Sequence, residues 1–124
     1  MSREQHALGE HGERVAARWL VRKGWRILAR RFRCGHRDID LVARRGGTVA
    51  FVEVKARRDR TFGDPVAAVH WRKQRELGRS ARVWVARFGE PGLAYRFDVI
   101  GVLADGRRVR VRHVEDAFSL PVFP

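Results

Sequence analysis

Two segments of the chain have the spacing of amphipathic helices. Over residues 4–23, apolar or small side chains recur at i, i+4, i+7 and i+8, and Gly24 follows as a typical helix end. A second helical region begins at Asp64-Pro65, because Asp is a favoured N-cap and Pro a favoured first helical residue. We expect this region to continue to about Ala86, with Gly78 as the expected point of interruption.

Shorter segments rich in β-branched and aromatic residues predict strands. Residues 38–43 and 48–55 form one predicted hairpin, and residues 97–103 and 108–114 form another. A short strand is also expected at residues 25–28, at the start of a basic connector. Since no linker divides the chain, this order predicts a single α/β domain over residues 1–124, with a mixed sheet flanked by helices.

The first hairpin carries acidic residues within apolar sequence. With Gly46-Gly47 as a two-residue turn, Asp40 faces Glu53 and Asp38 faces Lys55, all on one face of the sheet. Opposed carboxylates repel, so this arrangement costs stability unless a cation lies between them. The competing interpretation is a solvated strand face, on which Glu53 and Lys55 are neighbours and Asp40 caps a nearby group.

A divalent cation would give this acidic pair a chemical role. Paired carboxylates suit Mg²⁺ or Mn²⁺, hard ions that also bind phosphate oxygens. Such an ion polarises a phosphodiester and lowers the pKa of an attacking water. Lys55 would then position that water or stabilise the charge that develops on the phosphate. The sequence therefore indicates phosphodiester chemistry at the hairpin.

The charge balance favours a nucleic-acid partner. The 124 residues include 27 Lys and Arg against 14 Asp and Glu, a net charge of +13 at pH 7. A field of this sign attracts phosphate backbones, although an arginine-rich codon bias would give a similar composition. The arginines gather on both sides of the acidic hairpin, and the candidate DNA contacts among them are Arg31, Arg33, Arg57 and Arg58.

The remaining features exclude several other classes of protein. No apolar run approaches the ~20 residues of a membrane span, and the first residues do not resemble a signal peptide, so we expect a cytoplasmic protein with no membrane partner. The single cysteine, Cys34, excludes an internal disulfide and does not suggest a zinc site. The four tryptophans are expected to pack in or beside the core.

Seven short motifs are spread over nearly the whole chain. They are Gly12-Glu13, Gly24-Trp25-Arg26-Ile27-Leu28, Asp38-Ile39-Asp40-Leu41-Val42, Phe51-Val52-Glu53-Val54-Lys55, Phe62-Gly63-Asp64-Pro65, Arg96-Phe97-Asp98-Val99-Ile100 and Glu115-Asp116-Ala117-Phe118. Together these motifs resemble the small bacterial YraN-like family. That family is similar to archaeal Holliday junction resolvases and is placed in the PD-(D/E)XK nuclease superfamily, so the resemblance implies a restriction-endonuclease-like fold.

The resemblance also implies roles for individual residues. Glu13, Asp40 and Glu53 would hold the Mg²⁺ or Mn²⁺ ion, and Lys55 would complete the catalytic set. Without the resemblance, Glu13 is simply an acid at the border of a buried helix face that pairs with an arginine. Gln74 would match a polar residue near the phosphate. Asp98 is either a residue beside the metal ligands or a structural hydrogen-bond acceptor.

These observations lead to one expected function and two alternatives. We expect a Mg²⁺-dependent nuclease that hydrolyses DNA, with branched DNA favoured by analogy and a homodimer needed for two-fold cleavage. The first alternative is a nucleic-acid-binding protein that keeps the nuclease fold without catalysis. The second is a scaffold for a protein partner, on which the basic surface is incidental.

Overall fold

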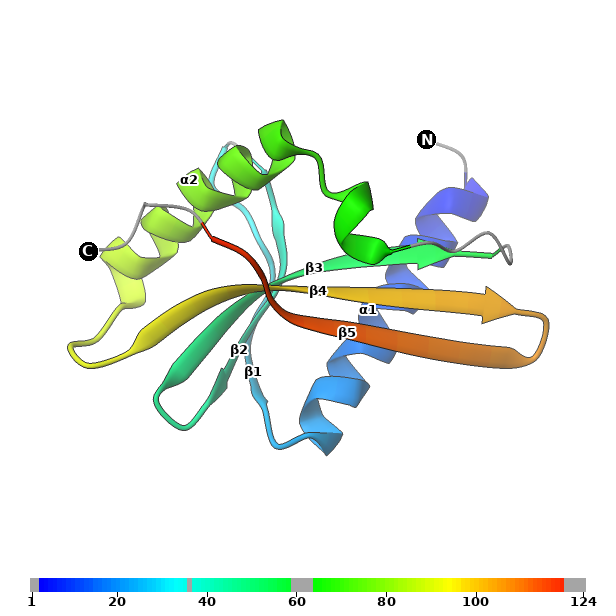
Figure 1. Cartoon of the computed structure of the whole chain (residues 1–124), viewed down its shortest axis with the longest axis horizontal. Helices are drawn as coiled ribbons and strands as arrows, with labels where there is room; N and C mark the ends of the chain where they lie inside the picture. The colour runs from blue at the N-terminus through cyan, green and yellow to red at the C-terminus, as the bar shows by residue number, and fades with distance from the viewer. Residues whose placement is uncertain (1–2, 36, 59–63, 120–124) are drawn as a thin grey trace.

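The protein, described here by a computed structural model at residues 3–35, 37–58 and 64–119, has one mixed β-sheet between two α-helices (Figure 1). This confirms the predicted α/β class and is consistent with a restriction-endonuclease-like fold. The elements are α1 (Arg3–Arg22), β1 (Arg26–Phe32), β2 (Ile39–Arg45), β3 (Thr48–Arg57), the 3₁₀ helix η1 (Pro65–Ala68), α2 (Trp71–Phe88), β4 (Ala94–Asp105) and β5 (Arg108–Phe118).

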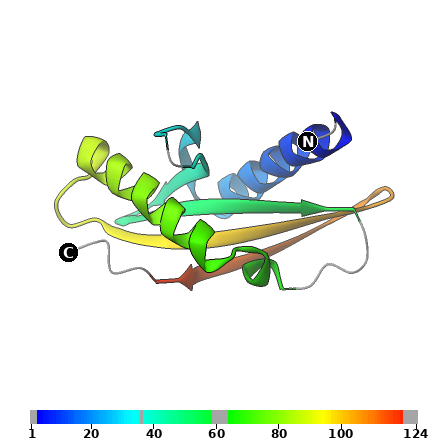
Figure 2. The same cartoon turned by 90° about the horizontal axis from the view of Figure 1, so that it is seen from above.

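The five strands follow one another across the sheet in chain order. Strands β3 and β4 are parallel, from Thr48 opposite Ala94 to Arg57 opposite Leu103, and every other neighbouring pair is antiparallel. A parallel pair needs a crossover, which η1 and α2 supply. Strands β3 and β4 run between α1 and the first turns of α2 (Figure 2).

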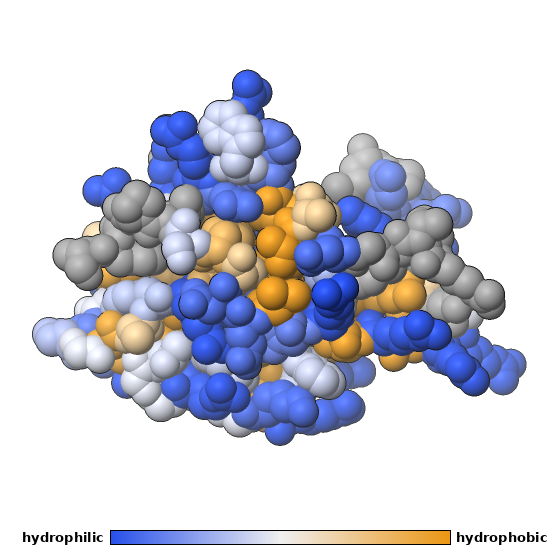
Figure 3. Space-filling view, viewed as in Figure 1, coloured by the Kyte–Doolittle hydropathy of each residue, from blue (hydrophilic) through white to orange (hydrophobic). Residues whose placement is uncertain are grey.

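Each helix covers one face of the sheet with its own apolar cluster. Helix α1 contributes Ala16, Ala17 and Leu20, which pack against β2, β3 and β4. Helix α2 contributes Leu77, Ala81 and Trp84 to the cluster on the other face. Because both faces are covered, side chains that point to either face of the central strands are buried. This explains the nearly continuous apolar sequence of these strands. The view from the α2 side shows a largely hydrophilic surface with a hydrophobic strip beside that helix (Figure 3).

The predicted helical region beginning at Asp64-Pro65 is divided at a different place from the one expected. Asp64 does act as an N-cap, accepting a hydrogen bond from the Val66 N–H, but η1 ends at Ala68. A new helix then begins after His70, whose side chain accepts from the Arg72 N–H. Gly78 lies buried inside an uninterrupted α2, because tertiary packing outweighs the ~1 kcal/mol that an interior glycine costs.

Other boundaries also differ from the sequence-based expectations. Strand β1 has seven residues, so it occupies much of the segment expected to be a basic connector. The last hairpin is longer than predicted at both ends, since β4 begins at Ala94 and β5 ends at Phe118. Trp25 and Trp84 are buried and Trp19 is half-buried as expected, but Trp71 is 54% exposed. Phe62 and Gly63 lie outside the described residues, and within the described part no helix is long and apolar enough to cross a membrane.

Helix α1 approaches β3 very closely at Gly12, and a methyl group there would overlap the sheet. A Cβ added to Gly12 would lie 2.8 Å from the Ala56 Cβ, whereas one added to Gly9 would meet nothing within 4 Å. We therefore expect Gly12→Ala to lower the free energy of unfolding by about 1–3 kcal/mol, through overpacking. Gly9→Ala should raise it by up to about 1 kcal/mol through helix propensity.

Urea unfolding of both variants measures the difference. Adding Ala56→Gly to the Gly12→Ala protein removes the Ala56 methyl group that the new side chain overlaps. Part of the lost stability should therefore return. Equal stabilisation by the two Gly→Ala substitutions would contradict the close approach.

Candidate active site

The candidate site forms where β2 separates from β3. The hairpin has the predicted register from Arg45 opposite Thr48 up to Leu41 opposite Val52, where the pairing ends. Beyond that point β3 continues beside β4 as far as Arg57. The Val54 N–H, on the side that β2 has left, donates to the Asp40 Oδ2 at 2.8 Å. The Asp40 carboxylate thus accepts the hydrogen bond that a backbone carbonyl of β2 would accept if the strand pair continued.

Glu53 is a nearly buried acid held by two lysines. Its residue is 6% exposed, and its Oε1 lies 2.9 Å from the Lys73 Nζ and 3.4 Å from the Lys55 Nζ. Lys55 was expected from the sequence, but Lys73 was not assigned a role there. Lys73 stands in the first turn of α2, so only the packing of that helix on the sheet brings it to Glu53.

Glu13 enters the site from the opposite face of the sheet. It follows Gly12, whose close contact with Ala56 brings α1 onto this part of β3. Its Oε2 lies 3.1 Å from the Arg31 Nη2, so Glu13 does pair with an arginine while still reaching the site. Arg31 has a φ of 52°, a left-handed conformation that costs a non-glycine residue about 1–2 kcal/mol.

These three carboxylates line a single open cavity of about 480 Å³. The structure therefore brings Glu13, Asp40 and Glu53 together, as the sequence and the resemblance implied. Asp38 also lines the cavity, but it pairs with Arg33 at 3.5 Å and does not face Lys55, because the β2–β3 ladder ends before either residue. The complete lining consists of Gly9, Glu13, Arg37, Asp38, Asp40, Glu53, Val54 and Lys73.

Lys55, Arg31 and Arg33 contact acids of this cavity without lining it, and three further candidate residues also lie outside it. The Gln74 amide donates to the Val69 carbonyl at 2.9 Å, so it joins α2 to the preceding turn while its neighbour Lys73 enters the cavity. Arg57 and Arg58 are exposed at the end of β3, where the Arg57 guanidinium donates to the Ala56 carbonyl.

Asp98 has a structural role within the described residues. It is fully buried and accepts hydrogen bonds from the Asp116 N–H at 3.0 Å and from the His113 Nε2 at 2.7 Å. The Arg96 Nε lies 3.0 Å from the Asp98 Oδ1, the oxygen that also accepts from the Asp116 N–H. Burial pushes the pKa of Asp98 up, but the bonds from His113 and Asp116 and the charge of Arg96 outweigh it and hold the pKa below its usual value.

The electrostatics of the cavity disfavour full ionisation. Burial, reinforced by the negative charge of Glu53, raises the pKa of Asp40 to about 8, even though the Val54 N–H opposes the shift. Burial, together with the adjacent Lys73 ammonium, lowers the pKa of Lys55 to about 8. A carboxyl and an amine with such values can exchange protons near neutral pH.

The cavity has the donor chemistry for a hard divalent cation, because carboxylate oxygens are the ligands that Mg²⁺ and Mn²⁺ prefer. The positive charges of Arg31, Lys55 and Lys73 lie beside two of the acids, Glu13 and Glu53. Within the described ranges, no three His, Cys, Asp or Glu side chains stand close enough together to hold a metal ion. Metal binding would therefore require the carboxylates to move closer together and their cationic partners to shift.

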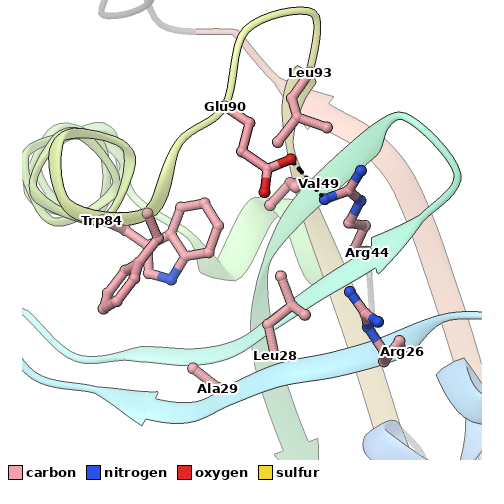
Figure 4. Close-up of a pocket in the computed structure, with 9 residues that line it drawn as sticks. Arg26, Leu28, Ala29, Arg44, Val49, Trp84, Glu90 and Leu93 are labelled. Carbon is pink, nitrogen blue, oxygen red and sulfur yellow. Dashed lines mark hydrogen bonds and ion pairs between the residues drawn. The ribbon is translucent and has the colours of Figure 1, made fainter.

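A second cavity, of about 270 Å³, lies between β1, β2 and the C-terminal end of α2 (Figure 4). Its lining combines apolar side chains, among them Leu28, Trp84 and Leu93, with charged ones. At its rim the Arg44 Nη1 lies 3.2 Å from the Glu90 Oε2. It contains none of the candidate catalytic residues.

Comparison with known proteins identifies relatives of similar sequence. Residues 12–102 match the model of a family described as "Uncharacterised protein family UPF0102". The chain is 40% identical over 120 residues to a UPF0102 protein of Geobacter metallireducens, with 97% of this chain and 98% of the relative covered. It is 43% identical to a UPF0102 protein of Nocardia farcinica (93% and 91% covered) and 46% identical to one of Symbiobacterium thermophilum (90% and 95% covered).

The raised pKa of Asp40 predicts a pH-dependent cost to stability. Because its folded-state pKa of about 8 lies above the ordinary 3.8, the unfolded chain releases this proton first, and stability falls as pH rises from about 4 to about 8. Asp40→Asn has no such proton to lose. The free energy of unfolding of the variant, minus that of wild type, should therefore be at least about 1 kcal/mol larger at pH 8 than at pH 5.

Urea unfolding at the two pH values tests this expectation. Asp38→Asn is the matched control, because it removes a carboxyl from the same cavity rim that is paired with Arg33 in a half-exposed position. A pH profile that is the same for Asp40→Asn and wild type would contradict the electrostatic account of the site.

Proposed function

The chain belongs to the uncharacterised protein family UPF0102, and from that premise we propose that it is a metal-dependent nuclease that hydrolyses DNA phosphodiester bonds. One observation carries the proposal. Carboxylates from α1, β2 and β3, namely Glu13, Asp40 and Glu53, line one open cavity beside Lys73. An acidic cavity in a chain of net charge +13 is an expected arrangement for binding both a divalent cation and a polyanion.

The proposed chemistry assigns a role to each residue. Asp40 and Glu53, with Glu13, would hold Mg²⁺ or Mn²⁺, which when bound polarises the phosphodiester and lowers the pKa of the attacking water. A cation held by Glu53 would weaken the attraction of this carboxylate for the Lys55 and Lys73 ammonium groups. Both lysines would then be available to contact phosphate oxygens and stabilise the charge that develops there. With a pKa near 8, the Lys55 Nζ can also give up or accept a proton.

The proposed substrate follows from the charged surroundings. Arg31 pairs with Glu13 and Arg33 with Asp38, two acids of the cavity, and in this proposal their guanidinium groups would also contact a phosphate backbone. Arg57 and Arg58, exposed at the end of β3, would extend that contact. DNA is the substrate that we propose, with branched DNA favoured by analogy. We place the reaction in the cytoplasm, with a homodimer for two-fold cleavage.

A second candidate function is binding of nucleic acid without catalysis. The observation that favours it is the charge compensation, since Arg31 pairs with Glu13 and both Lys55 and Lys73 pair with Glu53. Such a protein would hold DNA through the same arginines and would need no divalent cation.

The two functions differ in metal binding and turnover. We expect calorimetric titration of Mn²⁺ and Mg²⁺ to show binding by wild type, and the same samples to cleave four-way-junction or duplex DNA only with metal. The double variant Asp40→Asn/Glu53→Gln should lose metal binding and at least about 100-fold in cleavage rate. Glu90→Gln is the control, because it removes an acid at the other cavity.

Each outcome separates the candidates. Metal-dependent cleavage that survives Glu90→Gln and is lost in the double variant supports the nuclease. The absence of metal binding at millimolar concentrations, with DNA present or absent, would remove it and leave the binding protein.

Adjacent residues on α2 offer a sharper test of the roles assigned within the site. Lys73→Met removes a cation within 2.9 Å of Glu53, so cleavage should fall by about 100-fold, mainly in kcat. Gln74→Leu removes the bond to the Val69 carbonyl, so it should cost about 1 kcal/mol of stability with little change in kcat. Single-turnover cleavage and urea unfolding measure the two effects. The reverse pattern would assign to Gln74, rather than to Lys73, the position beside the phosphate.

A further inference from the structure

A third cavity lies at the C-terminal end of α1, away from the carboxylates. It has a volume of about 590 Å³ and is lined by residues of α1, β2 and β5 and by Lys23, which follows α1. The lining residues are Trp19, Lys23, Arg45, Arg112, His113, Val114 and Glu115. It shares no residue with the carboxylate cavity.

Three cations converge on this cavity without an acid to neutralise them. Within the described part of the chain, Lys23, Arg45 and Arg112 form no ion pair. The Lys23 ammonium instead lies 4.7 Å from the centre of the Trp19 ring, and Arg45 donates one hydrogen bond to the Lys23 carbonyl. Glu115, the one acid in the lining, lies 3.4 Å from Arg96. The cavity therefore has a net positive charge.

Hydrogen bonds fix the Trp19 and His113 side chains that line the cavity beside these cations. The Trp19 Nε1 donates to the His113 Nδ1 at 3.3 Å, so the other ring nitrogen of a neutral His113 carries the hydrogen and donates it to Asp98. The charge of Asp98 is taken up by Arg96 and the Asp116 N–H. This leaves the cations of the cavity free of a competing buried acid and holds the Trp19 ring in place.

We propose that this cavity binds a phosphate group of the DNA backbone, with Lys23, Arg45 and Arg112 as its ligands. The inference rests on the proposed function, because it takes DNA as the shared ligand of both cavities. Glu13 lies in α1, and Lys23 lies ten residues later, in the turn that ends this helix. At 1.5 Å per residue, the two positions are about 15 Å apart along the helix axis. That length corresponds to about four base pairs of a duplex with a rise of about 3.4 Å.

The first test compares two double variants that each remove two positive charges. Lys23→Gln/Arg112→Gln empties the cavity of two ligands and leaves Arg45 to support the end of α1. Arg79→Gln/Arg82→Gln removes two exposed arginines from α2. Fluorescence anisotropy with a labelled duplex of about 16 base pairs, without divalent metal, measures affinity across a range of salt concentrations.

We expect the cavity variant to bind the duplex about tenfold more weakly at physiological salt. The slope of log affinity against log salt concentration should become shallower by at least about one phosphate contact. The α2 variant should change both quantities less. Equal effects of the two variants would overturn the inference, because charge alone would then account for binding.

A second measurement does not depend on cleavage. In ¹⁵N spectra, the indole signal of Trp19 should shift when inorganic phosphate or the duplex is added, and not with chloride at equal ionic strength. Trp84, in the core on the α2 side, is the internal control. The signals are assigned with Trp19→Phe.

The outcomes distinguish this inference from the proposed function. Binding at the cavity without any cleavage would support the inference and count against the nuclease. Cleavage with no response at Trp19 to phosphate or duplex would overturn the inference and leave the nuclease standing. A response to inorganic phosphate alone would identify a small-anion site and overturn the assignment to DNA.

Discussion

The hydrogen bond from the Val54 N–H to the Asp40 carboxylate is the interaction on which the candidate site depends. A strand that loses its neighbour exposes backbone donors, and an unsatisfied buried donor costs about 1–3 kcal/mol. Asp40 satisfies one of them, so β2 can diverge while β3 continues beside β4. The divergence opens the cavity and places Asp40 next to Glu53. The same carboxylate thus ends one strand pair and creates the crowded charge of the site.

Charge compensation is the second organising constraint. Each acid of the cavity is matched by a partner from another element: Glu13 by Arg31 of β1, and Glu53 by Lys73 of α2. Asp40 instead accepts a hydrogen bond from a backbone N–H, and burial raises its pKa. The protein holds acids in a buried place by distributing cations around them, which is also how a site can release those cations to a phosphate group.

The sequence was sufficient for much of this picture where local patterns decide it. The hairpin register follows from the turn at Gly46-Gly47, and the meeting of Asp40 with Glu53 follows from that register. The roles of Lys73 and Gln74 could not be predicted, because neighbours on a helix point about 100° apart and only the docking of α2 selects one. The break at His70 was likewise missed, since it depends on a histidine acting as a cap.

The parallel pairing of β3 with β4 has a consequence for how the protein folds. Asp40 and Glu53 lie in β2 and β3, which pair locally, and Glu13 lies in the preceding helix α1, whereas Thr48 meets Ala94 only after a long crossover. Contacts between distant segments form slowly, because the intervening loop must be closed first. We therefore expect Asp40 and Glu53 to meet before Lys73 arrives. Completion of the sheet and pairing of Glu53 with Lys73 would then be a single late event.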